Sequence, residues 1–422
     1  MYMINEPQNA SQRILCIIFL TIFIDMIGIG ILVPVFPMLI VSTSSFKIIP
    51  NAWSASDGLI MAGWLMSAFP LMQFLFAPIL GQLSDRYGRR KILVLSIAGT
   101  AISYVLFAIG IITKNIPLLF ISRALDGASG GNISVAQAVI GDVSHPDRLA
   151  RNFGLVGVAL GFGFILGPFM GGILSDPNFV SWFNLATPFW FAAILSAVNF
   201  ILVLILLPET LKINNHKKIN ITKPLYNIMQ IFKMNQVGNV IITIFLFNAG
   251  FTFFTTFWGV VLADRFGFKQ GSIGGFFAYL GIMIVLAQGF VVRGLFRKAT
   301  DYKILYFSII GTGLCVAIYY LIPANHTSWI YYATPLLAVF SGLTKAFSMA
   351  LLSRIAPTES RGEVMGVNSS ASALSQSIPA IMAGYVAAYY SALPVLVGAI
   401  IIILAGILFI IFNHGTNTSL KN

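Results

Sequence analysis

About twelve long apolar stretches run through this chain and leave it few folds to adopt. Each is close to the roughly 20 apolar residues that a helix needs to cross a bilayer. Backbone groups in hydrocarbon must find partners within their own segment, so we expect helices, and the ten-residue alternation of a membrane β-barrel is absent. Only 9% of the 422 residues are charged, whereas soluble domains have about a quarter. The sequence therefore predicts an all-α membrane protein with spans near residues 13–40, 59–80, 92–112, 117–141, 152–175, 187–207, 238–262, 272–292, 303–322, 329–352, 364–387 and 391–412.

The net charge of +12 is unevenly distributed between the loops. If the N-terminus is cytoplasmic, most lysines and arginines lie in cytoplasmic loops, and the outer loops hold Lys47, Lys114, Arg265 and Lys269. The positive-inside rule then predicts a multi-pass protein of the cell (inner) membrane with both termini in the cytoplasm. The basic surplus is thus a topology signal, so we expect the lipid bilayer and no nucleic acid as its partner.

The longest polar segment divides the spans into two groups of six. It predicts an N-terminal six-helix bundle (1–207), a cytoplasmic linker (208–236) and a C-terminal six-helix bundle (237–422). A weak repeat supports this division, because residues 81–93 and 293–305 align without a gap and share a Leu and a Lys-Ile-Leu run. Inverted or parallel repeats of this kind place a substrate site near the midplane between the halves.

Ionisable side chains within spans are costly and are therefore candidate functional groups. The predicted spans contain Asp25, Arg123, Asp126 and Lys345. Asp25 is either a proton carrier or a structural acid bonded to a neighbouring helix. Arg123 and Asp126 share a helix face, so they either neutralise one another or form a proton relay.

Lys345 is the most individual feature of the sequence. It lies too deep in its span to snorkel easily, and the predicted C-terminal spans contain no acid. It therefore contacts an anionic substrate, pairs with Asp25 or Asp126, or lies outside a span whose boundary is misplaced.

Neutral polar residues and aromatic residues within the spans are candidates to line a cavity with these charges, although a single aromatic residue more often packs or faces lipid. The polar candidates are Asn132, Gln137, Asn248 and Gln288, and the aromatic ones are Phe251, Phe254, Phe257 and Trp258. No grouping of His, Cys and acids suggests a metal or a nucleophile, and no Gly-x-x-x-x-Gly-Lys-Ser/Thr loop is present. We therefore expect that the protein is not an enzyme and uses no cofactor. We also expect a functional monomer.

Two glycine-containing motifs resemble signatures of the major facilitator superfamily, specifically its drug:proton antiporters with twelve spans. The loop motif, between the second and third spans, consists of Gly81, Asp85, Gly88, Arg89 and Arg90. The antiporter motif of the fifth span consists of Gly163, Gly167, Pro168, Gly171 and Gly172; its glycines four apart also allow close helix packing. Arg123 with Gly127 resembles the fourth-span motif linked to proton transfer, and Asp25 with Gly28, Gly30, Pro34 and Pro37 is similar to the tetracycline-exporter branch.

The resemblance implies a proton-coupled antiporter that exports a small organic compound by alternating access, as in multidrug efflux and antibiotic resistance. Asp85 would face the N-terminal end of the eleventh span, near Glu363–Asn368, and Arg89 would pair with Asp142. Together these would latch the halves on the inner side, and the fifth span would pack on the eighth and block a proton leak.

Departures from the exporter pattern favour a ligand other than tetracycline. Ser103 stands where those exporters have an acid, Asp126 stands where they have a small apolar residue, and Lys345 is foreign to the pattern. The rival interpretations are a proton-coupled importer of an anionic metabolite or siderophore, a membrane-embedded enzyme and a receptor without transport.

Overall fold

The computed structural model describes residues 8–41, 48–145, 148–211, 235–292, 301–357 and 361–414, and these form helices without a strand. The first group of helices is α1 (Gln8–Val41), α2 (Ala55–Tyr87), α3 (Arg89–Ile112), α4 (Ile116–Ser129), α5 (Asn132–Val143), α6 (Leu149–Leu174) and α7 (Thr187–Leu206). The second is α9 (Asn235–Phe266), α10 (Gln270–Leu286) with its π-helical continuation η2 (Ala287–Val292), α12 (Asp301–Leu321), α13 (Ser328–Ile355), α14 (Arg361–Tyr389) and α15 (Leu393–His414).

Within the described ranges, 10 helices are individually long and apolar enough to cross a membrane. The two remaining predicted spans also occur as helices. The span 364–387 is the serine-rich helix α14. The span 117–141 was expected to be one helix and is two, because α4 ends at Ser129 and α5 begins at Asn132.

The break lies at Gly130 and Gly131. Glycine disfavours a helix interior by about 1 kcal/mol relative to alanine, and two in succession weaken the helix locally. The Gln73 side chain of α2 then donates a 3.0 Å hydrogen bond to the carbonyl of Gly130. A neighbouring helix thus satisfies a backbone group that a continuous helix would satisfy internally.

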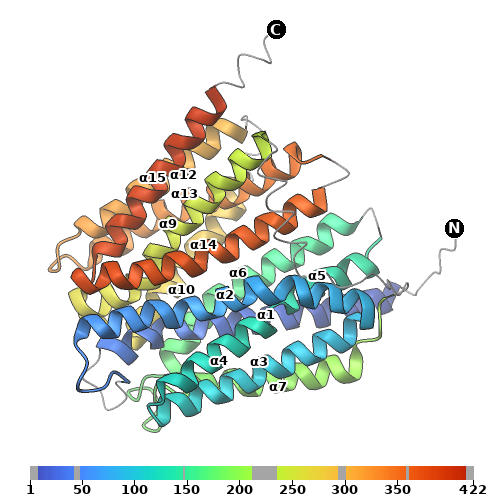
Figure 1. Cartoon of the computed structure of the whole chain (residues 1–422), viewed down its shortest axis with the longest axis horizontal. Coiled ribbons are helices and arrows are strands. Elements are labelled where there is room, and N and C mark those ends of the chain that lie inside the picture. The colour runs from blue at the N-terminus through green and yellow to red at the C-terminus, as the bar shows by residue number, and fades with distance from the viewer. Residues whose placement is uncertain are drawn as a thin grey trace.

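The helices assemble into two bundles that diverge toward the end where both termini lie (Figure 1). In the first bundle α1 packs on α6 and α3 packs on α4 and α7; in the second, α15 packs on α9 and α12. Between the bundles α2 lies along α14, and α6 lies along α10.

Glycines bring the bundles together at the end opposite the termini. A methyl group on Gly63 of α2 would lie 2.6 Å from the carbonyl oxygen of Ala380 and 2.9 Å from the Cα of Gly384, both in α14. One on Gly172 of α6 would lie 3.1 Å from the Cα of Gly274 in α10. Toward the terminal end, Gly81 and Gly366 on α2 and α14 have nothing within 4 Å. The structure is therefore closed at one end and open at the end that carries the termini.

Candidate functional site

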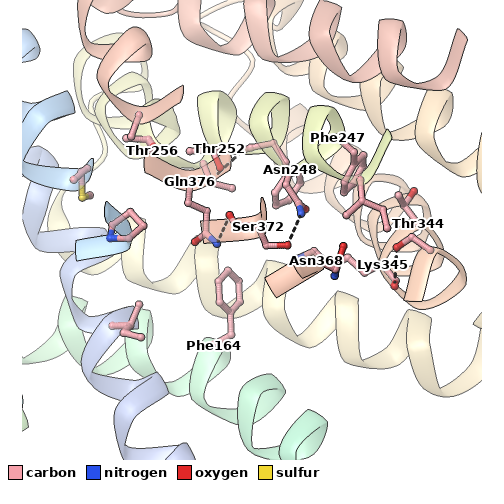
Figure 2. A pocket seen from close by; sticks show the side chains of 18 of the residues that line it. Phe164, Phe247, Asn248, Thr252, Thr256, Thr344, Lys345, Asn368, Ser372 and Gln376 are labelled. Carbon is pink, nitrogen blue, oxygen red and sulfur yellow. Dashed lines mark hydrogen bonds between the residues drawn. The ribbon is translucent and has the colours of Figure 1, made fainter. Parts of the chain in front are cut away.

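A cavity of about 580 Å³ lies between the two bundles. This volume is in the range of small-molecule sites in proteins. Apolar and aromatic side chains form most of its wall, including Met66, Phe69, Phe164, Phe247, Phe251 and Phe277. Its polar lining comes mainly from α9, α13 and α14, as Figure 2 shows, and includes Asn248, Thr252, Lys345, Asn368, Ser372 and Gln376.

Asp25 lies on α1 inside the first bundle and is only 6% exposed. Its Oδ2 accepts a 2.6 Å hydrogen bond from Nδ2 of Asn132, the first residue of α5. Its Oδ1 is buried and has no hydrogen-bond partner among the described residues. The break between α4 and α5 places Asn132 at a helix start, where α5 can present its side chain to α1.

Arg123 and Asp126 form a buried ion pair on α4. Arg123 Nη1 lies 3.1 Å from Asp126 Oδ2, and both side chains are 3% exposed. The guanidinium also lies over the ring of Phe107, 4.8 Å from its centroid, which is within cation–π range. Arg123 belongs to the cavity wall as well. The pair therefore connects the acids of the first bundle to the space in which a substrate would sit.

Lys345 projects from α13 into the cavity, where its Nζ lies 5.0 Å from the ring centroid of Phe251 on α9. The expected alternative of an ion pair with Asp25 or Asp126 is not formed, since Asp25 is bound to Asn132 and Asp126 to Arg123. The predicted span lies within α13, which runs from Ser328 to Ile355.

Of the four neutral polar residues expected to line the cavity, Asn248 does so. Its Nδ2 donates to Ser372 Oγ across 3.3 Å. Asn132, Gln137 and Gln288 are not among the lining residues. Gln137 lies on α5, which the break separates from α4, and Gln288 lies on the π-helical segment η2. The cavity lining thus includes Asn248 of these four, while Asn132 instead binds Asp25 inside the first bundle.

The loop motif is built around Arg89 at the start of α3. Arg89 Nε lies 3.1 Å from Asp142 Oδ2, so the ion pair implied by the resemblance is present. Arg89 also pairs with Asp85, whose side chain is 49% exposed, and Arg90 donates to the carbonyl of Leu204 on α7. Asp85 is thus held by its own bundle in this open structure.

Glu209 joins this motif, and the sequence analysis missed it. Its carboxylate accepts hydrogen bonds from the backbone N–H groups of Arg89 and Arg90 at 2.9 and 3.3 Å. Gly88, at φ +105°, provides no side-chain cap for α3, and a carboxylate at a helix N-terminus is stabilising. The available signal was a lone acid directly after Pro208, at the point where the sixth span ends.

The antiporter motif contacts two helices. A methyl group on Gly167 would lie 2.8 Å from the Cα of Gly30, and one on Gly171 would lie 2.5 Å from the carbonyl of Ile31. Gly163 likewise lies against Met26 of α1. The expected packing on the eighth span is made by Gly172 and by the Pro168 carbonyl, which touch Gly274 of α10. Residues four apart share one helix face, so most of the motif serves α1 rather than the boundary between the bundles.

Comparison with known proteins adds evidence independent of this geometry. The family model described as Major Facilitator Superfamily matches residues 18–380. The chain is 29% identical over 362 residues to tetracycline resistance protein, class C, of Escherichia coli, covering 84% of this chain and 85% of the relative. It is 31% identical over 293 residues to the class H protein of Pasteurella multocida, covering 68% of each. The solved structure of a D-xylose–proton symporter superposes with a TM-score of 0.75 at 14% identity, covering 94% of this chain and 97% of the symporter, which supports the fold alone.

Proposed function

Since the chain belongs to the Major Facilitator Superfamily, we propose that it is a proton-coupled antiporter that exports a small organic compound. It is a multi-pass membrane transporter rather than an enzyme, and its curated relatives are tetracycline resistance proteins. Export, proton coupling and a cargo of drug type are the parts that this proposal adds.

The observation that carries the proposal is the presence of two buried acids in the first bundle, Asp25 and Asp126, the second of which pairs with an arginine of the cavity wall. An ionised carboxylate surrounded by apolar helices is costly, and taking up a proton removes that cost. Asn132 donates to Asp25, which favours the ionised form of that carboxyl. These two opposed influences make Asp25 suited to bind and release a proton in each cycle.

Asp126 gives the proton a connection to the cargo. Protonation of Asp126 would weaken its pair with Arg123, which lines the cavity. The guanidinium would then be available to the cavity, and binding of cargo there would favour return of the proton. Proton and cargo thereby compete for one arginine, which is what exchange requires.

We place the termini in the cytoplasm, so that the open end faces inward. The halves would be residues 1–207 and 237–422, joined by a cytoplasmic linker at 208–236. Rocking of the halves would then close the inner end and open the outer one. Asp85, which is half exposed in the open structure, would reach the start of α14 in the closed one and form the latch together with Arg89 and Asp142.

Proteoliposomes with an imposed pH gradient test the coupling. Asp25→Asn should abolish uphill drug transport, because an amide cannot carry the proton. Asp264→Asn is the matched control. Asp264 lies apart from Asp25 and Asp126, and it accepts a 2.6 Å hydrogen bond from Ser391 Oγ. Undiminished uphill transport by Asp25→Asn would remove the proposed role.

A second candidate is a proton-coupled importer of an anionic metabolite or siderophore, which the cavity-facing Lys345 favours. A dye that reports lumenal pH distinguishes the two. For an antiporter, cargo added outside the vesicles should make the lumen alkaline, because protons leave in exchange. For a proton-coupled importer it should make the lumen acidic, because protons enter together with the cargo.

A further inference from the structure

We propose that the cargo is an amphipathic organic anion whose charged group binds Lys345; this inference rests on the proposed transport function and names its substrate class. Among the residues that the structure describes, those lining the cavity include two cationic side chains, Arg123 and Lys345, and no aspartate or glutamate. Arg123 is already neutralised by Asp126 at 3.1 Å. The cavity wall therefore carries one uncompensated positive charge.

The position of Lys345 makes that charge significant. It lies ten residues before the end of α13 at Ile355, which is about 15 Å along a helix that rises about 1.5 Å per residue. Its side chain is exposed and lines the cavity. An ammonium at this depth is costly unless it is paired, and an anion entering the cavity would supply the missing partner.

The contact that Lys345 makes with Phe251 is weak and can be exchanged. Its Nζ lies over the ring of Phe251 at 5.0 Å. A cation–π contact holds the ammonium without consuming its three N–H donors. Those donors remain available for the oxygens of a carboxylate, sulfonate or phosphate.

Neutral polar groups of the second bundle line the same cavity as Lys345. Asn248 Nδ2 bonds to Ser372 Oγ at 3.3 Å, and Gln376 Nε2 bonds to the Ser372 carbonyl at 3.2 Å, both drawn as dashed lines in Figure 2. Asn368 is 4% exposed, and its Oδ1 has no partner among the described residues. Amides and hydroxyls of this kind can orient an anionic group.

The opposite walls define the rest of the cargo. Phe164 faces the polar cluster from α6 (Figure 2), and Phe247 and Phe277 add further aromatic surface. A small hydrophilic anion would leave this surface wet. The combination of one charge, a few amides and several aromatic rings matches an aromatic or otherwise apolar body with a single acidic group.

A matched pair of probes isolates the charge. 8-Anilinonaphthalene-1-sulfonate and neutral N-phenyl-1-naphthylamine share one aromatic body and differ by a sulfonate. Equilibrium dialysis against protein in phosphatidylcholine nanodiscs, with empty nanodiscs subtracted, gives the affinity for each. We expect the wild type to bind the sulfonate at least about tenfold more tightly, the ratio that one charged hydrogen bond supplies.

Variants assign the preference to Lys345. Lys345→Met should lower the sulfonate affinity at least about tenfold and leave the neutral probe unchanged, while Lys345→Arg should retain the preference. Lys269→Met, which removes a lysine outside the cavity, should bind both probes like the wild type. Equal sulfonate affinity in Lys345→Met and wild type, no saturable sulfonate binding, or a parallel loss of both probes would each overturn the inference.

The proposed function can fail separately. If the sulfonate preference depends on Lys345 but no transport responds to a pH gradient, the substrate class stands and the coupling falls. If Asp25→Asn abolishes gradient-driven transport while Lys345→Met binds the sulfonate normally, the proton coupling stands and the substrate class falls.

Discussion

Asp126→Asn should destabilise the protein by leaving Arg123 as an uncompensated buried charge. Both side chains of the pair are 3% exposed, and Arg123 Nε and Nη2 have no hydrogen-bond partner among the described residues. Removal of one partner from a buried ion pair costs about 3–5 kcal/mol. We expect a value near the lower limit, because the ring of Phe107 remains 4.8 Å from the guanidinium.

The size of the loss follows from the electrostatics of the site. Two unit charges about 4 Å apart interact by about 4 kcal/mol at an effective dielectric constant of about 20. The ring offsets up to about 2 kcal/mol of the cost of the lone arginine. The net loss then lies between about 2 and 4 kcal/mol, a range that includes the lower limit given above.

A double-mutant cycle separates this electrostatic effect from a general packing defect. The variants are Asp126→Asn, Arg123→Gln and the double substitution, unfolded with sodium dodecyl sulfate in mixed micelles. The near-ultraviolet circular dichroism of buried aromatic residues such as Tyr104 and Phe107 reports the loss of packing. In the double variant two amides can bond to one another, so it should lose at least about 1.5 kcal/mol less than the sum of the single losses. Losses that add within about 0.5 kcal/mol, or wild-type stability in Asp126→Asn, would refute the reasoning.

Three further substitutions test the packing described above. Gly167→Ala should lower stability and transport because its methyl group would lie 2.8 Å from a backbone atom of α1, whereas Gly157→Ala, which has open space, should match the wild type in a thermal-stability assay. Gly63→Leu should hold α2 and α14 apart at the end opposite the termini; disulfide cross-linking between these helices there should fall, and unchanged cross-linking would contradict the contact. Glu209→Ala should remove the cap of α3 and cost about 1–2 kcal/mol, seen as faster hydrogen exchange in its first turn, while Glu209→Gln, which keeps an acceptor, should cost less.

Features that depend on residue type and sequence distance were predictable. The length of the apolar stretches predicted the helices. The cost of charge in a bilayer made candidate functional groups of four side chains within the predicted spans, Asp25, Arg123, Asp126 and Lys345. The pairing of Arg123 with Asp126 follows from a spacing of three residues on a helix. Each of these predictions needs only the residues of a single helix and their spacing along the chain.

Features that depend on how helices meet were not predictable. Gly130 and Gly131 were visible within an apolar run. The break between the helices also depends on Gln73 of another helix, which donates a hydrogen bond to the Gly130 carbonyl. Gln137 was consequently assigned to the cavity, although it lies beyond that break. Glu209 follows the sixth span, and its role exists because the end of α7 lies beside the start of α3, which no pattern along the chain encodes.

The lone ammonium of Lys345 also determines which form of stored energy such a carrier could draw on. If a monovalent anion leaves in exchange for one incoming proton, each turnover moves two charges in the same electrical sense. A membrane potential contributes about 2.3 kcal/mol per charge for every 100 mV, so voltage alone would drive export even where the pH on both sides is equal. A carrier that exchanged a monovalent cation for one proton would be electrically silent and would depend on acidity outside. One side chain on α13 would thus decide whether the transporter keeps working in alkaline surroundings.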